Sequence, residues 1–227
     1  MANPQRIPQL TKDGSFTLAI PGLDLTFHSR HGAIRESKHV FIEAGLRSLL
    51  EKAGENLTIF EMGFGTGLNA LLTLMEAVKI KRPVQYTAIE LYPIETSEAL
   101  GLNYCVQLER MDLLPYYTLL HDCEWESKIP VSPYFHFQKI KADLREFSSS
   151  TQFDLVYYDA FAPTAQPALW TPEIFETLYQ WMRPAGILVT YSSKGEVRRS
   201  LQSAGFEVEK LPGPPGKREI TRAKKPG

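Results

Sequence analysis

The sequence has few of the features that define several large classes of protein. Only two of its 227 residues are cysteines, Cys105 and Cys123, and they form no Cys-x-x-Cys pair. Neither a disulfide framework nor a cysteine metal site is therefore expected. The five histidines show no metal-ligand spacing, and we expect His28 and His31 at the surface. No apolar run approaches the ~20 residues of a membrane span, and the first residues lack the apolar core of a secretory signal. These absences favour a cytoplasmic protein with no metal and no membrane partner.

Charge of one sign is also scarce, because 25 Lys and Arg residues nearly balance 26 Asp and Glu residues. With 43% hydrophobic residues, the chain has enough apolar side chains to form one well-packed domain rather than a disordered one. The balance hides an asymmetry, since residues 194–227 hold nine basic and four acidic residues. A basic terminal segment can bind a polyanion, although a solvated terminus is the commoner cause of such a run.

The pattern changes near residue 36. Before it, the turn dipeptides Asp13-Gly14 and Pro21-Gly22 separate stretches in which apolar and polar residues alternate, which predicts an N-terminal β-hairpin extension over 1–36. From Ser37 the period becomes helical. The apolar face of this helix is expected at Val40, Phe41, Ala44, Leu49, Leu50 and Ala53. We expect residues 37–227 to form a single catalytic core.

Predicted strands and helices alternate through this core. The strands are expected at 57–62, 84–91, 134–140, 153–158, 187–191, 206–210 and 218–224. The helices are expected at 68–78, 96–106, 109–120, 173–182 and 195–204, and residues 183–186 are expected to end the helix at 173–182. Such alternation predicts an α/β fold: a Rossmann-like, doubly wound, mostly parallel sheet with helices on both faces. Ligands bind these sheets at the carboxyl ends of the strands, so the residues at those ends are the candidates for a site.

A glycine-rich loop follows the first of these strands. It runs Glu61-Met62-Gly63-Phe64-Gly65-Thr66-Gly67, and Glu90 lies 23 residues after its last glycine, at the end of the second strand. A carboxylate at that position can accept both hydroxyls of a ribose. A pyrophosphate favours the positive end of a helix and no nearby carboxylate. The acid at the start of the loop, Glu61, therefore favours S-adenosylmethionine, which carries a cationic amine, over a dinucleotide.

Two further acids follow predicted strands. Asp143 has the position that faces the adenine amino group in this class of fold, although an exposed Asp at a strand end is about as common. Asp159 is expected beside the methyl group of the cofactor; the alternative is that it only caps the following loop. Phe161 adds an aromatic ring two residues after Asp159.

Several segments together resemble the MnmC-type tRNA methyltransferases, which complete 5-methylaminomethyl-2-thiouridine at the tRNA wobble position. The segments that carry the resemblance are 28–33, 36, 39–41, 61–69, 159–163 with Trp170, 197–199, 204–206 and 216–219. They extend over nearly the whole chain and imply a class I S-adenosylmethionine-dependent methyltransferase fold. A chain of 227 residues has no room for the FAD-dependent oxidase domain of the bifunctional members. It therefore resembles the stand-alone methylase form, which needs no oxidoreductase partner in the same chain.

The residues and the resemblance together imply a set of roles. Asp159 is the expected catalytic residue, which orients the substrate amine and accepts its proton. The expected residues of the S-adenosylmethionine site are Glu61, Gly63, Phe64, Gly65, Thr66, Gly67, Asn69, Glu90, Asp143 and Leu144. The residues expected to bind the anticodon region of the tRNA are Arg35, Glu36, Phe161, Lys194, Arg198, Lys217 and Arg218.

Two other functions stay open. One is a methyltransferase or aminopropyltransferase on the same fold that acts on small amines, which would not need the basic C-terminal segment. The other is a non-catalytic protein that binds S-adenosylmethionine or RNA. The presence of both Asp159 and Glu61 counts against this second alternative.

Overall fold

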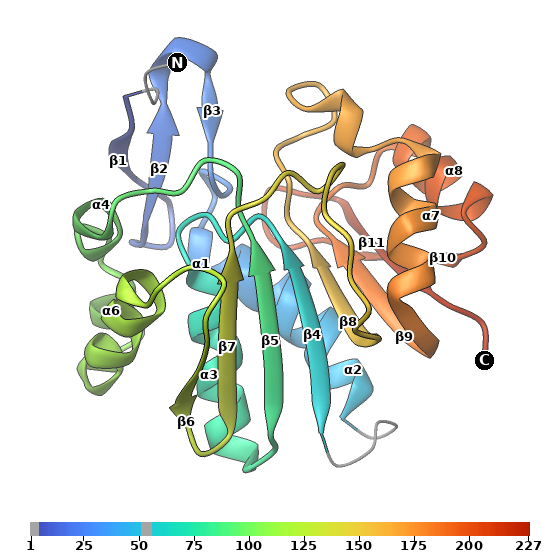
Figure 1. Cartoon of the computed structure of the whole chain (residues 1–227). Helices are drawn as coiled ribbons and strands as arrows, with labels where there is room; N and C mark the ends of the chain where they lie inside the picture. The colour runs from blue at the N-terminus through green and yellow to red at the C-terminus, as the bar shows by residue number, and fades with distance from the viewer. Residues whose placement is uncertain (1–4, 51–55) are drawn as a thin grey trace.

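The computed structural model describes residues 5–50 and 56–227, which form a large and a small β-sheet (Figure 1). The large sheet has eight strands in the order β10-β11-β9-β8-β4-β5-β7-β6. Its strands are β4 (Leu57–Met62), β5 (Val84–Ile89), β6 (Lys128–Ser132), β7 (Phe135–Ile140), β8 (Phe153–Tyr158), β9 (Met182–Thr190), β10 (Glu207–Pro212) and β11 (Glu219–Lys224). The five strands from β9 to β7 pair in parallel, and β6, β10 and β11 pair antiparallel. The predicted α/β fold with a mostly parallel sheet is confirmed.

The sheet reverses its direction of winding between β4 and β8. From β4 the chain adds β5 and then β7 on one side, whereas β8 and β9 are added on the other side. Met62 at the end of β4 is level with Ile89 of β5 and with Tyr158 of β8. The carboxyl ends of the three strands therefore meet at one edge, at the type of switch point where open α/β sheets bind ligands.

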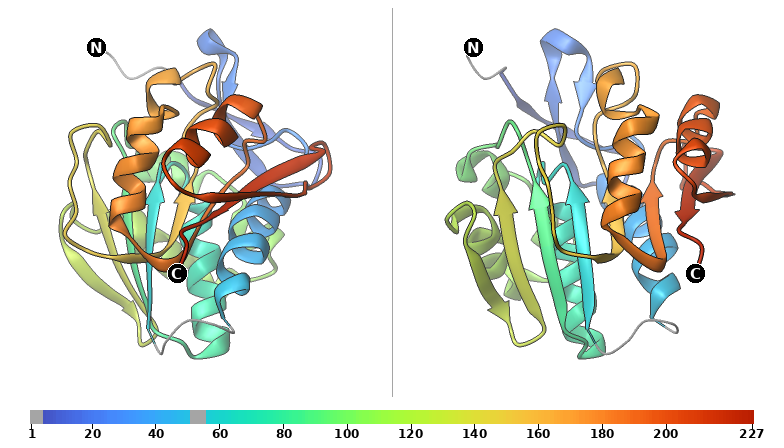
Figure 2. Two further views of the ribbon diagram at one scale, coloured as in Figure 1. Left: turned by 90° about the vertical axis from the view of Figure 1, so that its right-hand side faces the viewer. Right: turned by 45° about the vertical axis from the view of Figure 1, so that its right-hand side comes forward.

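Helices cover both faces of this sheet (Figure 2). One face carries α7 (Pro172–Trp181) and α8 (Gly195–Ser203). The other carries α3 (Leu68–Ile80), α5 (Tyr104–Gln107), α6 (Leu114–Asp122) and a helical run made of α1 (Ala33–Ser37), the π-helix η2 (Lys38–Leu46) and α2 (Arg47–Leu49). The shorter helices are α4 (Thr96–Leu100) and the 3-10 helices η1 (Pro21–Leu23), η3 (Met111–Leu113) and η4 (Pro167–Leu169).

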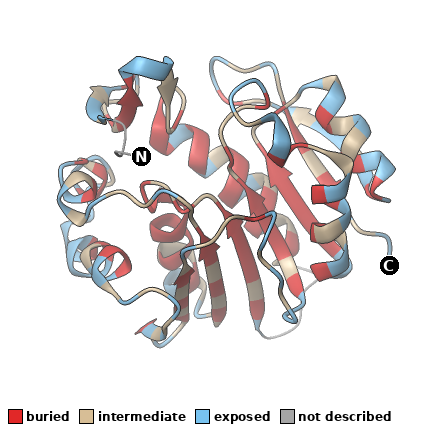
Figure 3. Ribbon diagram, turned by 45° about the horizontal axis from the view of Figure 1, so that its top comes forward, coloured by how far each residue is buried: buried red, intermediate tan, exposed pale blue. Residues whose placement is uncertain are grey.

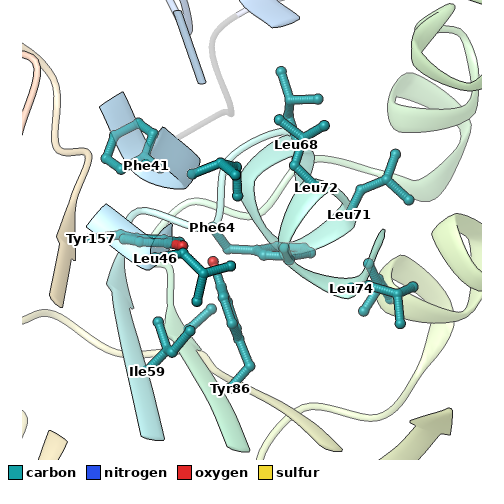
Figure 4. Packing of buried hydrophobic residues seen from close by; sticks show 14 of the residues in the cluster. Phe41, Leu46, Ile59, Phe64, Leu68, Leu71, Leu72, Leu74, Tyr86 and Tyr157 are labelled. Carbon is teal, nitrogen blue, oxygen red and sulfur yellow. The ribbon is translucent and has the colours of Figure 1, made fainter. Parts of the chain in front are cut away.

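The hydrophobic core lies between the sheet and these helices. Figure 4 shows part of this core, with leucines of α3 and the rings of Tyr86 and Tyr157, which come from β5 and β8. Phe41 of η2 packs against Tyr157 with their ring centroids 5.2 Å apart. Burial on both faces is what the continuous apolar strands of a parallel sheet require. Figure 3 shows the consequence, with the central strands buried and the exposed residues in the surrounding loops and helices.

The N-terminal extension differs from the predicted hairpin. It is a three-stranded sheet of β1 (Ile7–Leu10), β2 (Phe16–Ile20) and β3 (Leu25–Thr26), which lies beyond the carboxyl edge of the large sheet (Figure 1). The sequence pattern misses β1 because Ile7 and Leu10 are exposed, so this strand has no alternation of burial. The helix expected from Ser37 begins earlier, at Ala33, so the predicted boundary at residue 36 falls inside α1. Ala53, expected on the apolar face of that helix, lies outside the described residues.

The helical stretches predicted at 96–106 and 109–120 are present but divided into shorter helices. The first stretch contains α4 and most of α5, the second contains η3 and most of α6, and Glu109 between them has a left-handed backbone with φ of 55°. Apolar residues that suggest continuous helices, such as Val106 and Met111, are more than half exposed. The helix that precedes residues 183–186 ends before them, as predicted, and these residues belong to β9. Ala185 there has a φ of 63°, and the pairing of β9 with β8 shifts its register at this point.

Candidate active site

The glycine loop between β4 and α3 has the tight turn that its sequence predicts. Gly63, Gly65 and Gly67 all have positive φ, between 50° and 89°. A Cβ atom on Gly63 would lie 2.9 Å from the carbonyl oxygen of Asp159, and one on Gly67 would lie 2.7 Å from Nε2 of His121. The loop can therefore follow this path only with glycine at these positions. It brings the backbone of β4 and the first turn of α3 against the end of β8.

Four buried side chains hold the loop at Thr66. Nε2 of His28 is 2.8 Å from the Thr66 hydroxyl, which also accepts a hydrogen bond from Tyr104. The Thr66 carbonyl accepts hydrogen bonds from Tyr117 and from Nε2 of His121. Burial lowers the pKa of both His28 and His121 to about 4, so both rings are neutral at pH 7. The expectation that His28 lies at the surface is wrong, because its ring links the N-terminal extension to the glycine loop.

Glu90 also contacts the loop. It follows β5, and its carboxylate accepts hydrogen bonds from the backbone N–H of Gly65 at 3.0 Å and from that of Tyr92 at 2.9 Å. A carboxylate offers about four acceptor positions. Two positions are left for further donors at the carboxyl end of the strand.

Glu61 and Asp159 lie at the ends of the two strands that flank the switch point, and Asn69 of α3 joins them. The Asn69 amide nitrogen donates hydrogen bonds to Oε1 of Glu61 at 3.0 Å and to Oδ2 of Asp159 at 2.8 Å. The backbone N–H of Asp159 bonds to the carbonyl of Met62, which fixes the start of the following loop against β4. The structure thus brings together a predicted catalytic residue and two predicted cofactor residues.

Both acids are harder to ionise than ordinary carboxylic acids. Burial raises the pKa of Glu61 well above its usual value; the negative charge of Asp159 adds to the rise, and the hydrogen bond from Asn69 opposes it. Burial also raises the pKa of Asp159 to about 7, and the charge of Glu36 contributes to this rise. Asn69 and Lys217 act in the opposite direction. A carboxyl group that titrates near pH 7 is able to accept a proton at physiological pH.

Glu36 and Lys217 reach this cluster from opposite ends of the chain. Glu36 of α1 is buried, and its carboxylate lies 2.5 Å from the ammonium nitrogen of Lys217, in the loop between β10 and β11. The same ammonium group lies 3.9 Å from the centroid of the Tyr191 ring, directly after β9. The strand ends expected to carry functional residues are those of β4, β5, β7 and β8. β9 also ends at this edge of the sheet, and Tyr191 is the residue that follows it.

Two side chains donate hydrogen bonds to the backbone of the loop after Asp159. The Tyr191 hydroxyl donates to the Ala160 carbonyl at 2.8 Å, and Nε1 of Trp170 donates to the Phe161 carbonyl at 2.9 Å. Phe161 packs edge-on against Phe27 of the N-terminal extension, with centroids 5.2 Å apart. Phe27 also lies against Gly65, where a Cβ atom would be 3.2 Å from its ring. No sequence signal places Phe27 at the site, because its contacts depend on how the extension docks.

Asp143 and Leu144 lie at the end of β7, on the far side of β5 from Asp159. The Asp143 carboxylate forms an ion pair with Arg145, which holds its pKa below the usual range. Leu144 is buried. A cavity of about 570 Å³ opens beside them and is also lined by Leu91 and Phe147. Asp143 therefore lines a cavity at the end of β7, with its carboxylate already paired.

The remaining predicted tRNA contacts lie outside this cluster. Arg35 and Arg218 are exposed. Lys194, before α8, lies 3.6 Å from Glu196, and Arg198 of α8 lies 3.6 Å from Glu219. In the part of the chain that the structure describes, no group of three His, Cys, Asp or Glu side chains could hold a metal ion. Within the same residues, no helix is both long and apolar enough to cross a membrane.

The site fits a cationic, nucleoside-containing ligand. Glu36 and Glu61 both lie near Asp159, and Lys217 is the cation paired with Glu36, so acidic groups outnumber the basic one. Oδ1 of Asn69 is buried and has no hydrogen-bond partner among the described residues. A bound amine or sulfonium group would relieve the repulsion between the acids, and a donor would satisfy Oδ1. The glycine loop leaves its backbone open to close approach, as a nucleoside cofactor needs.

Comparison with known proteins gives a consistent result. A family model described as S-adenosyl-L-methionine-dependent methyltransferase matches residues 125–226. The tRNA 5-methylaminomethyl-2-thiouridine biosynthesis bifunctional protein MnmC of Cupriavidus metallidurans is 32% identical over 232 residues, which cover 96% of this chain and 33% of that protein. The protein of the same name from Pseudomonas savastanoi is 29% identical over 86% of this chain and 31% of that protein. The chain spans about a third of the length of these curated relatives.

A solved structure matches over a larger share of its own length. The crystal structure of MnmC2 from Aquifex aeolicus superposes with a TM-score of 0.74 at 26% sequence identity and covers 98% of this chain and 72% of that one. The chain therefore has the fold of the S-adenosylmethionine-dependent methyltransferases, and, as its motifs predict, it is similar to the MnmC proteins along nearly its whole length.

Proposed function

We propose that this chain is an S-adenosylmethionine-dependent enzyme that methylates the aminomethyl nitrogen of 5-aminomethyl-2-thiouridine at the tRNA wobble position, giving 5-methylaminomethyl-2-thiouridine. The observation that carries the proposal is the cluster of Glu61, Asn69 and Asp159 at the switch point of the sheet. The similarity to MnmC proteins along nearly the whole chain supports the choice of substrate.

The glycine loop and the strand ends beside it are the proposed cofactor site. When bound, S-adenosylmethionine supplies the methyl group. Glu61 and Asn69 would hold its amino-acid portion, because a buried carboxylate and a free carbonyl oxygen suit an ammonium group. Glu90 would accept the ribose hydroxyls with the acceptor positions that Gly65 and Tyr92 leave open. Residues at 142–144 are the proposed neighbours of the adenine ring.

Asp159 is the proposed catalytic residue. An alkylamine is mostly protonated at pH 7, and only its neutral form has the lone pair that attacks a methyl group. The pKa of Asp159, raised to about 7, matches the task of accepting that proton, and the Asn69 amide holds Oδ2 in one place. The rigid loop attachment through Met62, Ala160 and Tyr191 supports orientation of the amine, which is worth at least as much as the proton transfer.

The tRNA is proposed to bind across the same edge of the sheet. Phe161 would stack on the target base, and Glu36 would face the aminomethyl group. Exposed Arg35 and Arg218, with Lys194 and Arg198 near α8, would contact phosphates of the anticodon region. We further propose that residues 1–36 act as an extension of a single catalytic core, that no metal and no oxidase domain in this chain are needed, and that the protein works in the cytoplasm.

Two alternatives make different predictions. A small-amine methyltransferase would also use the acids of the cluster but would methylate free amines without RNA. A non-catalytic binding protein would bind the cofactor and transfer nothing. The basic C-terminal segment and the similarity to tRNA-modifying MnmC proteins favour the tRNA enzyme over both.

Nucleoside analysis tests the proposal. Purified protein, S-adenosylmethionine and tRNA bearing 5-aminomethyl-2-thiouridine are incubated, and the digested nucleosides are identified by mass spectrometry. We expect the aminomethyl nucleoside to convert to its methylated form, and we expect tRNA from cells without the protein to accumulate the unmethylated nucleoside. If the protein methylated free amines but did not methylate the tRNA, the result would contradict the proposal.

A further inference from the structure

Lys217 occupies a position that a flexible phosphate contact would not need. Its ammonium nitrogen is 2.5 Å from Oε1 of Glu36 and 3.9 Å from the centroid of the Tyr191 ring, and its side chain is only 27% exposed. Tyr191 in turn donates its hydroxyl proton to the carbonyl of Ala160, the residue after Asp159. One lysine thus joins the N-terminal helix, the end of β9 and the loop that carries the catalytic acid.

The loop that carries Lys217 is fixed to the N-terminal segment on either side of this contact. Nε2 of His39 lies 2.8 Å from the carbonyl oxygen of Pro212. The His31 ring lies so close to the backbone of Gly216 that a Cβ atom there would collide with it. The path of the loop therefore holds the Lys217 side chain toward Glu36. Its neighbour Arg218 is exposed instead.

The charged groups around Asp159 determine how easily it ionises. The groups that face it are Glu36 from α1, Glu61 from β4, the Asn69 amide from α3, the Tyr191 ring after β9 and Lys217. Glu36 opposes ionisation of Asp159, whereas Asn69 and Lys217 favour it. A cation held on a ring face and beside a carboxylate in a partly buried site acts strongly on charges within a few ångströms.

We propose that Lys217 is a positioning residue of the active site: its ammonium group holds Glu36 against Tyr191 and balances the negative charge beside Asp159, so that Asp159 is able to act as a proton acceptor. This role rests on the proposed methyl transfer. It replaces the phosphate contact that the sequence predicts for Lys217. Glu36, held in place by the same lysine, presents its second oxygen to the backbone N–H of Ser29.

The first test uses no tRNA and no cofactor, so it does not depend on the proposed function. Protein labelled with ¹³C at the aspartate carboxyl carbons is titrated by NMR, and the Asp159 signal is identified by its loss in Asp159→Asn. We expect a midpoint near 7 in the unsubstituted protein and a clearly higher midpoint in Lys217→Met, because the favourable charge is gone. Lys217→Arg keeps the charge and should keep the midpoint within a few tenths of a unit. Lys224→Met, an identical change at an exposed position of β11, should leave it unchanged.

The second test measures single-turnover methylation against pH with saturating tRNA. The acid limb of the Lys217→Met profile should move to higher pH by the same amount as the NMR midpoint, and Lys217→Arg should restore it. If Lys217→Met does not fold, Lys217→Gln removes the same charge in a polar form. An unchanged midpoint and profile, with weaker tRNA binding and a smaller salt dependence, would show a phosphate contact and overturn the inference. Absence of methylation by the unsubstituted protein would instead contradict the proposed function and leave the NMR result standing.

Discussion

Replacing Asp159 by Asn removes the proposed proton acceptor while changing the shape of the site very little. The new side chain keeps one carbonyl oxygen, which can still accept the hydrogen bond that Oδ2 now receives from Asn69 at 2.8 Å. The loop is also held by backbone hydrogen bonds to Met62 and through the Ala160 carbonyl, and these do not involve the carboxylate. The variant should therefore fold and should still bind S-adenosylmethionine.

The expected loss is in the rate of methyl transfer. A positioned general base contributes typically about 10²–10⁴-fold. With a pKa of about 7, roughly half of the Asp159 side chains are ionised at pH 7 and are available for the proposed role. The Asp159→Asn variant should lose about that factor at saturating cofactor and tRNA. Raising the pH should recover part of the loss, because more of the substrate amine is then neutral without assistance.

The same substitution should change stability in a way that depends on pH. The pKa of Asp159 is higher in the folded protein, at about 7, than its usual value of 3.8. The unfolded chain therefore releases this proton more readily, and ionisation destabilises the wild-type fold progressively as the pH rises from about 4 to about 7. The amide of the Asp159→Asn variant cannot ionise. The melting temperature of the variant relative to wild type should therefore rise across that range, from a small difference near pH 4.

Two measurements decide the assignment. Single-turnover methylation compares the rates, and calorimetric melting at several pH values compares the stabilities. A variant that methylates at the wild-type rate would show that Asp159 only caps its loop. A stability difference that does not vary with pH would show that the carboxyl group does not titrate near 7.

Three further substitutions test other parts of the site. Glu90→Ala should weaken S-adenosylmethionine binding roughly 10- to 150-fold, since hydrogen bonds to a charged group are worth about 1.5–3 kcal/mol; unchanged affinity in isothermal titration calorimetry would remove Glu90 from the ribose site. Gly63→Ala should lower stability by about 1–3 kcal/mol, because φ is 89° and the new Cβ atom would lie 2.9 Å from the Asp159 carbonyl; an unaltered denaturation midpoint would contradict this. Arg218→Glu should weaken tRNA binding and make its salt dependence shallower while sparing cofactor affinity. If the variant and the unsubstituted protein had the same tRNA affinity and the same salt dependence, Arg218 would not contact the tRNA.

The sequence predicts best the parts of the fold that depend on local pattern. β4 and β8 have the expected bounds of 57–62 and 153–158, because a strand buried on both faces reads as a continuous apolar run. The glycine loop follows for a similar reason, since its backbone conformation needs glycine at fixed positions. Each of these features is determined by residues that are neighbours in the chain.

The parts that the sequence does not predict depend on packing between distant segments. β6 is an edge strand containing Pro130, with only Val131 buried, so it shows neither alternation nor an apolar run. In the region of α4 to α6, apolar residues such as Val106 face outward, and their spacing therefore suggests longer helices than the ones that form. The extension resembles a simple hairpin in its sequence because β1 shows no buried face.

The candidate site divides in the same way. The sequence identifies three acids of the site because they lie at the ends of predicted strands. The structure places all three, Glu61, Glu90 and Asp159, at the carboxyl edge of the sheet. The ion pair between Glu36 and Lys217 cannot be predicted from the sequence, because its partners come from the two ends of the chain. Basic residues near a terminus suggest phosphate contacts, and only the three-dimensional structure shows which of them faces inward. The functional roles themselves stay predictions.

The distribution of charge connects the choice of cofactor with the choice of substrate. Burying Glu36, Glu61 and Asp159 close together is costly unless positive charge enters the site, and Lys217 offsets only part of it. A dinucleotide would add further negative charge, whereas a sulfonium cofactor and a protonated amine each bring one positive charge. Burial, together with the charge of Glu36, raises the pKa of Asp159 to about 7, where it is able to take the proton of the amine. We infer that one arrangement of acids selects the cationic reactants and prepares the acceptor, while basic residues at the rim are left for the phosphates of the RNA.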